Sequence, residues 1–209
     1  MRRKERASYE RSTIHAILDE ALYCHVGFVL AGQPYVIPTV HARIGEHLYL
    51  HGAVASRTLR TAALASPLCV TVTLLDGLVL ARSAFNHSMN YRSVVILATA
   101  SELSDAAEKR AALEALVERV VPGRAAEVRA PSSKELNATA VLCVPIEEAS
   151  AKIRTGPPQD DAEDYALGCW AGVVPLQLTP GTPQPDPRLR APAPAPVLGA
   201  RGCGEPSRS

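Results

Sequence analysis

The chain has 209 residues, 47% of them hydrophobic, which at roughly 150 residues per domain predicts one domain with an appendage. Its 22 lysines and arginines nearly balance 21 aspartates and glutamates, which argues against a binder of nucleic acid or of an anionic membrane. No segment has the pattern of a signal peptide or a membrane span, and the five cysteines include no CxxC pair, so we expect a soluble cytoplasmic protein with reduced thiols.

Composition divides the chain into three parts. Residues 1–11 form a charged N-terminal arm, and residues 12–176 have the apolar patterning of a folded domain. Residues 177–209 contain 8 prolines and 4 glycines with few apolar side chains, which predicts a disordered tail.

The folded domain begins with a predicted helix followed by strands. Residues 12–22 repeat apolar side chains at helical spacing behind Ser12, a good N-cap residue. Apolar runs at 24–30 and 35–43 flank a turn, which predicts a hairpin. A further strand at 47–51 places its two leucines on one face and its two histidines and tyrosine on the other.

The remaining elements continue this meander. In chain order they are predicted as a helix at 55–65, strands at 68–75, 78–84 and 91–100, a helix at 104–120 and a strand at 138–146. Asp76 and Gly77 are typical of a tight hairpin turn, and Pro145 indicates an edge strand. About seven strands with few intervening helices predict a small antiparallel barrel with peripheral helices, too narrow to enclose a large ligand.

The first candidate site is the passage from strand 47–51 into helix 55–65. The free N–H groups and the dipole at the start of a helix attract a phosphate. The hydroxyl of Ser56 and the guanidinium of Arg57 would donate further hydrogen bonds to that phosphate. Alternatively, Ser56 only caps the helix and Arg57 is solvated, and the spacing leaves both interpretations open.

The second candidate site is the polar start of the strand near residue 91. Alternation places Asn90 and Arg92 on one face and Tyr91 and Ser93 on the other. Such a start is also typical of a solvated loop. Its coincidence with a helix start suited to phosphate favours a phosphorylated cofactor.

Other chemically active side chains form no clear motif. Trp170, the only tryptophan, is interpreted as a core or interface residue, although it could stack on a planar ring. His41, His47 and His51 have no cysteine or carboxylate at a metal-ligand spacing, so we expect no metal site. The cysteines of the apolar strands, Cys69 and Cys143, are expected to pack in the interior.

Seven segments together carry a family resemblance. They are RSTIHAILDEA (11–21), HVGF (25–28), PYVIPT (34–39), LYLHG (48–52), ASR (55–57), NYRSV (90–94) and WAGV (170–173). Over residues 6–176 the chain resembles the pyridoxamine 5′-phosphate oxidase-like family, and within it the flavin-nucleotide-binding branch, which is similar to nitroimidazole-reductase-related proteins. The resemblance implies a mainly β, Greek-key-like, antiparallel split barrel that forms a homodimer with FMN between the subunits.

The resemblance also implies cofactor contacts. Ser56 and Arg57 match the Ser-Arg pair that binds the FMN phosphate, and Arg92 is expected to replace a basic residue missing at Thr58. His51 matches a histidine near the flavin, with a hydrogen bond across the hairpin as the alternative, and residues 38–41 are expected to run along the flavin ring. The complete set is Pro38, Val40, His41, His51, Gly52, Ser56, Arg57, Asn90, Tyr91, Arg92, Ser93 and Trp170, and no catalytic residue is assigned.

The implied function is an FMN-dependent oxidoreductase that passes electrons from a reduced nicotinamide to a small organic acceptor. Pyridoxamine phosphate oxidation is not expected, because the Arg-x-His of that subfamily is absent after Trp170. The alternatives are a deazaflavin-dependent reductase and a non-catalytic protein that binds or stores flavin or haem. For haem we expect an exposed axial histidine such as His87.

Overall fold

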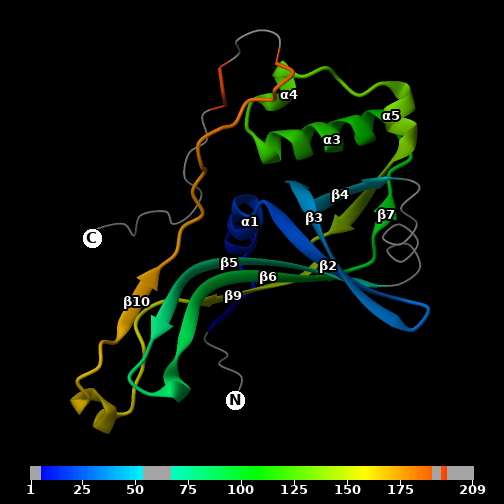
Figure 1. The fold of residues 1–209 in the computed structure, drawn as a ribbon. Coiled ribbons are helices and arrows are strands. Elements are labelled where there is room, and N and C mark those ends of the chain that lie inside the picture. The colour runs from blue at the N-terminus through cyan, green and yellow to red at the C-terminus, as the bar shows by residue number, and fades with distance from the viewer. Residues whose placement is uncertain (1–5, 54–66, 190–193, 197–209) are drawn as a thin grey trace. The chain divides into compact units, whose positions relative to one another are not determined.

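The computed structural model describes residues 6–53, 67–189 and 194–196 (Figure 1). Its strands are β1 (Ala7–Ser8), β2 (Tyr23–Leu30), β3 (Gln33–Ile44), β4 (His47–Ala53), β5 (Leu68–Leu80), β6 (Ser88–Ala98), β7 (Ser101–Glu102), β8 (Thr139–Pro145), β9 (Glu148–Arg154) and β10 (Gly172–Pro175). Its helices are α1 (Arg11–Glu20), α3 (Ala106–Val120), α4 (Arg124–Glu127) and α5 (Ser133–Ala138), with short 3-10 turns η2 (Ala84–Asn86) and η3 (Ala162–Ala166). The predicted helix 55–65 lies outside the described residues.

The chain divides into two compact units. The barrel unit comprises Met1–Leu74 and Tyr91–Arg154, and the second unit comprises Leu75–Asn90 and Thr155–Ser209. No helix in the described parts of the chain is both long and apolar enough to span a bilayer.

The strands form one sheet in the order β1-β9-β6-β5-β2-β3-β4-β8-β7, with β10 added to β5. The first residues of β3 pair antiparallel with β2, and its last residues pair antiparallel with β4, so this strand links the two halves of the sheet. The predicted fold class, a mainly β antiparallel split barrel with peripheral helices, is confirmed. Strands β1, β7, β9 and β10 were not among the predicted elements.

The hairpin of β2 and β3 forms where the sequence predicts it. Ala31 and Gly32 occupy the turn with φ values of 51° and 79°, the left-handed conformation that a two-residue hairpin loop requires. Leu30 pairs directly with Gln33, so the turn has two residues and Pro34 already belongs to the strand.

The core lies inside the barrel unit, because alternation along each strand turns every second side chain inward. Fully buried core side chains include Ile14 and Leu18 of α1, Val26 of β2, Leu48 and Leu50 of β4, Val70 of β5 and Ile96 of β6. The two leucines of β4 are buried while His47 and His51 are exposed, which confirms the predicted alternation of that strand.

The predicted hairpin at Asp76 and Gly77 is wrong, since β5 continues through both residues. Gly77 pairs with Pro175 of β10, and a Cβ atom built on it would lie 3.0 Å from the carbonyl oxygen of Val174. The glycine therefore permits a close approach of another strand and makes no turn.

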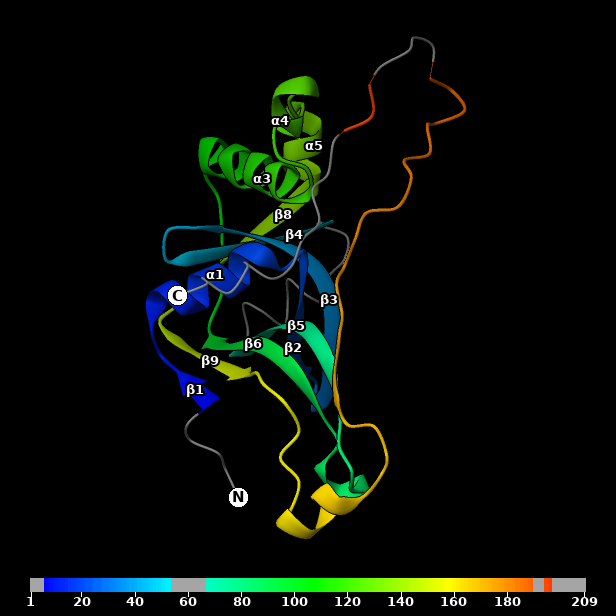
Figure 2. The same ribbon diagram turned by 90° about the vertical axis from the view of Figure 1, so that its left-hand side faces the viewer.

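Helix α3 runs over β3 and β4 in both views of the barrel unit (Figures 1 and 2). Its N-cap is Asp105, whose carboxylate accepts hydrogen bonds from the N–H groups of Ala107 and Glu108 at 2.9 and 2.8 Å. Near its other end, Arg119 donates to the carbonyl of Ala21 at 2.6 Å and so ties α3 to the end of α1.

Two predictions, the start of a helix and the position of an edge strand, are wrong. Helix α1 begins at Arg11 with Glu10 as its N-cap residue, so Ser12 lies inside the helix and the predicted N-cap is wrong by two residues. Strand β8 lies between β4 and β7 and is not an edge strand. Because the two-residue strand β7 reaches only Leu142 and Cys143, the proline at 145 interrupts no pairing on that side.

Candidate functional site

The structure brings three of the predicted cofactor residues to one face of the sheet. Tyr49 pairs with Ala42, a register that places Val40 and His51 on the same face, and Pro38 lies two residues further along β3 on that face. This outer face points away from the core, and Pro38 and His51 are exposed on it. The predicted grouping of strand 38–41 with His51 therefore exists as a continuous surface.

His41 lies on the opposite, inner face. Its side chain is 0% exposed, and its Nε2–H donates to the carbonyl oxygen of Leu18 at 2.9 Å, filling the core between β3 and α1. Burial lowers the pKa of His41 below its ordinary value, which keeps the ring neutral. A cofactor contact by the side chain of His41 is therefore excluded by packing, and only backbone groups of this residue remain for that role.

The polar start of β6 divides as alternation predicts, but its arginine has a different partner. Arg92 lies on the same face as the buried Val94 and forms a bidentate ion pair with Glu20 of α1, with Nη2 and Oε1 at 2.8 Å. The Glu20 carboxylate already matches its charge, so Arg92 anchors α1 and has less charge to offer to a cofactor phosphate. Tyr91 and Ser93 face the other way and remain partly exposed.

Two further predicted residues belong to the second unit. Asn90 is buried and donates from Nδ2 to the carbonyl of Gly156 at 3.2 Å, so it joins two segments of that unit. Trp170 is 65% exposed, and the interpretation as a core residue is wrong. Its ring lies against Gly172, where a Cβ atom would approach the indole to 3.0 Å.

The remaining predicted contacts surround the end of β4. Gly52 is partly exposed and pairs with Ala140 of β8. Ser56 and Arg57 lie outside the described residues, so the predicted phosphate site stays a prediction.

The second unit contains an ordered loop that the sequence did not reveal. The carboxylate of Asp160 accepts hydrogen bonds from the backbone N–H of Arg82 at 3.0 Å and from its guanidinium at 3.1 Å. The same carboxylate accepts from the N–H of Ser83 at 3.4 Å, and the Arg82 guanidinium lies 4.7 Å from the ring centroid of Tyr165. These contacts fix the residues between β5 and β6, with partners about 80 residues away in the sequence.

This loop orients His87, which follows η2. Its Nδ1 lies 2.9 Å from the carbonyl oxygen of Ser83, and because a carbonyl only accepts, Nδ1 carries the proton. In the neutral ring Nε2 therefore keeps its lone pair, on an exposed side chain. Phe85 and Met89, two residues from His87 on either side in the sequence, are also exposed, at 93% and 51%.

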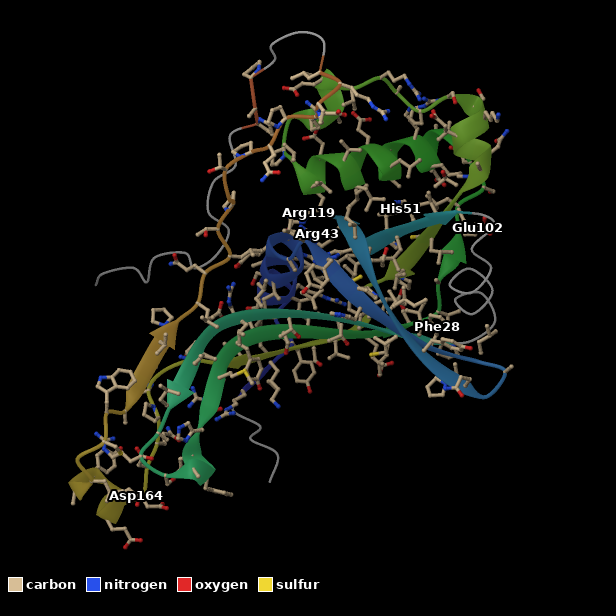
Figure 3. The ribbon with its side chains drawn as sticks, viewed as in Figure 1. Phe28, Arg43, His51, Glu102, Arg119 and Asp164 are labelled. Atoms are coloured by element: carbon tan, nitrogen blue, oxygen red, sulfur yellow. The ribbon has the colours of Figure 1, made fainter. Side chains whose placement is uncertain are left out.

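A groove of about 690 Å³ lies in the barrel unit between α3, residues 121–135 and the outer face of β3 and β4. Figure 3 shows His51 on β4 below α3, and this histidine and Val40 line the groove. The apolar side chains of α3 differ in their burial. Leu116 is buried, whereas Leu113 and Val117 are half-buried along the groove.

The described cysteines of the strands are at least half-buried. Burial raises the pKa of the Cys24 thiol to about 12, and burial also raises the pKa of the half-buried Cys143, so neither favours a thiolate. Cys69 is likewise half-buried. The described parts of the chain hold no group of three or more side chains arranged to bind a metal ion.

Comparisons with known proteins extend these observations. Residues 10–153 match the family model of pyridoxamine 5′-phosphate oxidase. The flavocytochrome Anf3 from Azotobacter vinelandii is 44% identical, with 94% of this chain and 92% of that one covered and a TM-score of 0.87. The FAD and haem binding protein from Mycobacterium smegmatis is 40% identical, with 91% and 94% covered and a TM-score of 0.85.

A more distant structure shares the fold. It is a candidate 5-nitroimidazole antibiotic resistance protein from Bacteroides thetaiotaomicron, 23% identical, with 70% of this chain and 86% of that one covered and a TM-score of 0.59. No curated protein matches the chain. The family model and the two relatives above 30% identity nonetheless cover most of the sequence, and the split-barrel sheet agrees with them. The chain belongs to the pyridoxamine 5′-phosphate oxidase family.

Proposed function

We propose that this protein is a redox protein that binds a flavin in the barrel unit and a haem through His87 of the second unit. Similarity over more than nine-tenths of the chain to a flavocytochrome and to a protein that binds FAD and haem supports this pair of cofactors. The orientation of His87 is the observation in this chain that carries the haem assignment.

The outer face of β3 and β4 suits a flavin ring. Pro38, Val40 and His51 present an extended strand and an exposed imidazole on one surface, and a narrow barrel leaves such a surface as the place for a large cofactor. Bound there, a flavin supplies hydride and single-electron chemistry, while His51 donates or accepts a hydrogen bond. Ser56 and Arg57 are the proposed ligands of the first phosphate, which FMN and FAD share.

The flavin of this proposal can be either FMN or FAD. The sequence resemblance implies FMN, whereas the relative from Mycobacterium smegmatis binds FAD. Mass spectrometry of the flavin released from the purified protein distinguishes them directly.

His87 has the features of a residue that would hold a haem. The hydrogen bond from Nδ1 to Ser83 fixes the tautomer, which is the usual way in which a metal-binding histidine is oriented. The Asp160 contacts hold the same loop in place, and Phe85 and Met89 offer apolar surface to a macrocycle. Haem would supply one-electron chemistry when bound, and these residues would hold it.

The full proposal includes turnover and assembly. Electrons would pass from a reduced nicotinamide to a small organic acceptor in a homodimer with flavin at the subunit interface. The exposed apolar residues Val29, Val36, Val95 and Leu97 on β2, β3 and β6 support such an interface, because apolar side chains on an exposed sheet often mark association surfaces. Light scattering of the eluting protein measures the mass, and Val36→Asp is expected to shift a dimer towards monomer.

Absorption spectroscopy tests the cofactor assignment. The protein, purified or reconstituted with haemin, FMN and FAD, should show both flavin bands and a Soret band. His87→Ala should lose the Soret band and keep the flavin, whereas His47→Ala, a change at another exposed histidine, should keep both. A Soret band in the His87→Ala protein would refute this ligand, and absence of both chromophores would overturn the proposal.

Anaerobic titration with NADH and NADPH tests turnover. Bleaching of the flavin bands at a catalytic rate supports an oxidoreductase. Flavin that stays oxidised with both donors favours instead a protein that binds or stores the cofactor.

A further inference from the structure

The groove beside α3 has the size and lining of a small-molecule site. Its volume of about 690 Å³ falls within the roughly 300–1,000 Å³ typical of ligand pockets. Leu113, Val117 and Val120 of α3 form one wall, and Val128 contributes to the opposite wall. Val120 and Val128 are 49% and 40% exposed, so the groove leaves apolar surface in contact with water that an apolar ligand would cover.

The arginines of the groove differ in their partners. Arg124 pairs with Glu127 at 2.6 Å, and Arg129 pairs with Glu135 at 2.5 Å. Arg110 forms no ion pair with a carboxylate of the described residues, and its one hydrogen bond joins Nη1 to the carbonyl of Pro131 at 3.2 Å. A guanidinium has five N–H donors, so most donors of Arg110 remain available.

This combination specifies the chemistry of a ligand. Arg110 is exposed at the groove, and a wholly apolar molecule would offer its guanidinium no acceptor. A dianion would meet Glu114, which lines the groove one helical turn from Arg110, while the other two arginines are neutralised. One carboxylate attached to an apolar body satisfies both the arginine and the valine and leucine walls.

We propose that this groove binds an amphipathic monocarboxylate, with its carboxylate on Arg110 and its apolar body along Leu113, Val117, Val120 and Val128. The proposal goes beyond the cofactor assignment, because Arg110 and these four apolar residues are not among the proposed cofactor contacts. Val40 and His51, two proposed flavin contacts, line the same groove, so a bound carboxylate would lie beside the proposed flavin surface.

Calorimetric titration of the full-length protein tests this inference with 4-phenylbutyrate as probe and 4-phenylbutanol and 4-phenylbutylamine as matched compounds. The carboxylate should bind about tenfold or more tightly than the alcohol, because the alcohol cannot form the charge-assisted hydrogen bond to Arg110. The amine should bind weakest, because its positive charge repels that of Arg110. The same titration before and after removal of any bound flavin keeps the result separate from the cofactor proposal.

Three variants locate the probe. Arg110→Gln should weaken carboxylate binding about tenfold and remove the preference over the alcohol, while Arg124→Gln, which changes a paired arginine of the same groove, should change it little. Val120→Trp should abolish binding by filling the groove, with circular dichroism as the check on folding. Equal affinity for acid and alcohol, unchanged binding by Arg110→Gln, or no binding at millimolar probe would each overturn the proposal.

Discussion

Replacement of His41 by glutamine should remove part of the acid sensitivity of the fold. Desolvation lowers the pKa of this buried imidazole, and the nearby Arg119 lowers it further, whereas the hydrogen bond to Leu18 and the charge of Asp19 act less strongly in the opposite direction. In the unfolded chain the histidine titrates near its ordinary value of 6.5. Below that pH His41 therefore binds a proton in the unfolded state more readily than in the folded state.

The sign and size of the effect follow from this difference. Stability from His41 is fully present above pH 6.5 and is lost as the pH falls, by at most about 1.4 kcal/mol per pH unit, or about 2 kcal/mol between pH 6.5 and 5. Glutamine still carries a donor for the Leu18 carbonyl but does not titrate. We expect His41→Gln to cost about 1–2 kcal/mol at pH 8 through imperfect packing and to flatten this part of the pH profile.

Urea unfolding at pH 8, 6.5, 5.75 and 5 measures the free energies. His47→Gln is the control, because His47 is exposed on β4 and should leave the slope unchanged. A variant His41→Gln that retains the wild-type slope would refute the assignment of a buried neutral imidazole. Flavin affinity measured on the same variant should remain within about twofold, since the side chain is enclosed by the core.

Three further changes test other parts of the structure. Arg57→Ala should weaken flavin binding about ten- to a hundredfold by removing a charge-assisted phosphate contact, and an unchanged Kd from fluorescence titration would contradict the phosphate placement. Arg92→Gln and Glu20→Gln should show a coupling energy of about 1 kcal/mol in a double-mutant cycle of urea unfolding, with flavin affinity preserved; additive effects would mean that the pair contributes nothing. Gly77→Val should lower the Tm because its side chain meets the backbone of β10, whereas Gly168→Val, where nothing lies near the added Cβ, should change it far less; equal shifts would argue against the β5–β10 pairing.

The sequence alone determined the features that depend on neighbouring residues. Alternation along residues 47–51 placed Leu48 and Leu50 in the core, and the turn predicted between the apolar runs 24–30 and 35–43 contains the observed loop at 31 and 32. Helical spacing located α1 and α3 within two residues of their observed starts. These patterns are readable because backbone periodicity and turn conformation act over a few residues.

Partners distant in the chain decided the remaining features. Alternation separates Val40 from His41, but only the packing of α1 against β3 makes the face of His41 the buried one. Arg92 has the sequence context of a phosphate ligand, but it forms an ion pair with Glu20, which lies 72 residues away in the sequence. Gly77 has the local signature of a turn, and the approach of β10 keeps it in a strand.

The candidate sites divide in the same way. His51 could be proposed from its motif, whereas the groove that it lines forms only when residues 121–135 fold back along α3. The orientation of His87 likewise needs the loop that Asp160 holds from a separate segment. A sequence pattern reflects the conformational preference of one segment, whereas a site forms where several segments come into contact. The contacts that determine the role of a side chain are therefore seen only in the tertiary structure.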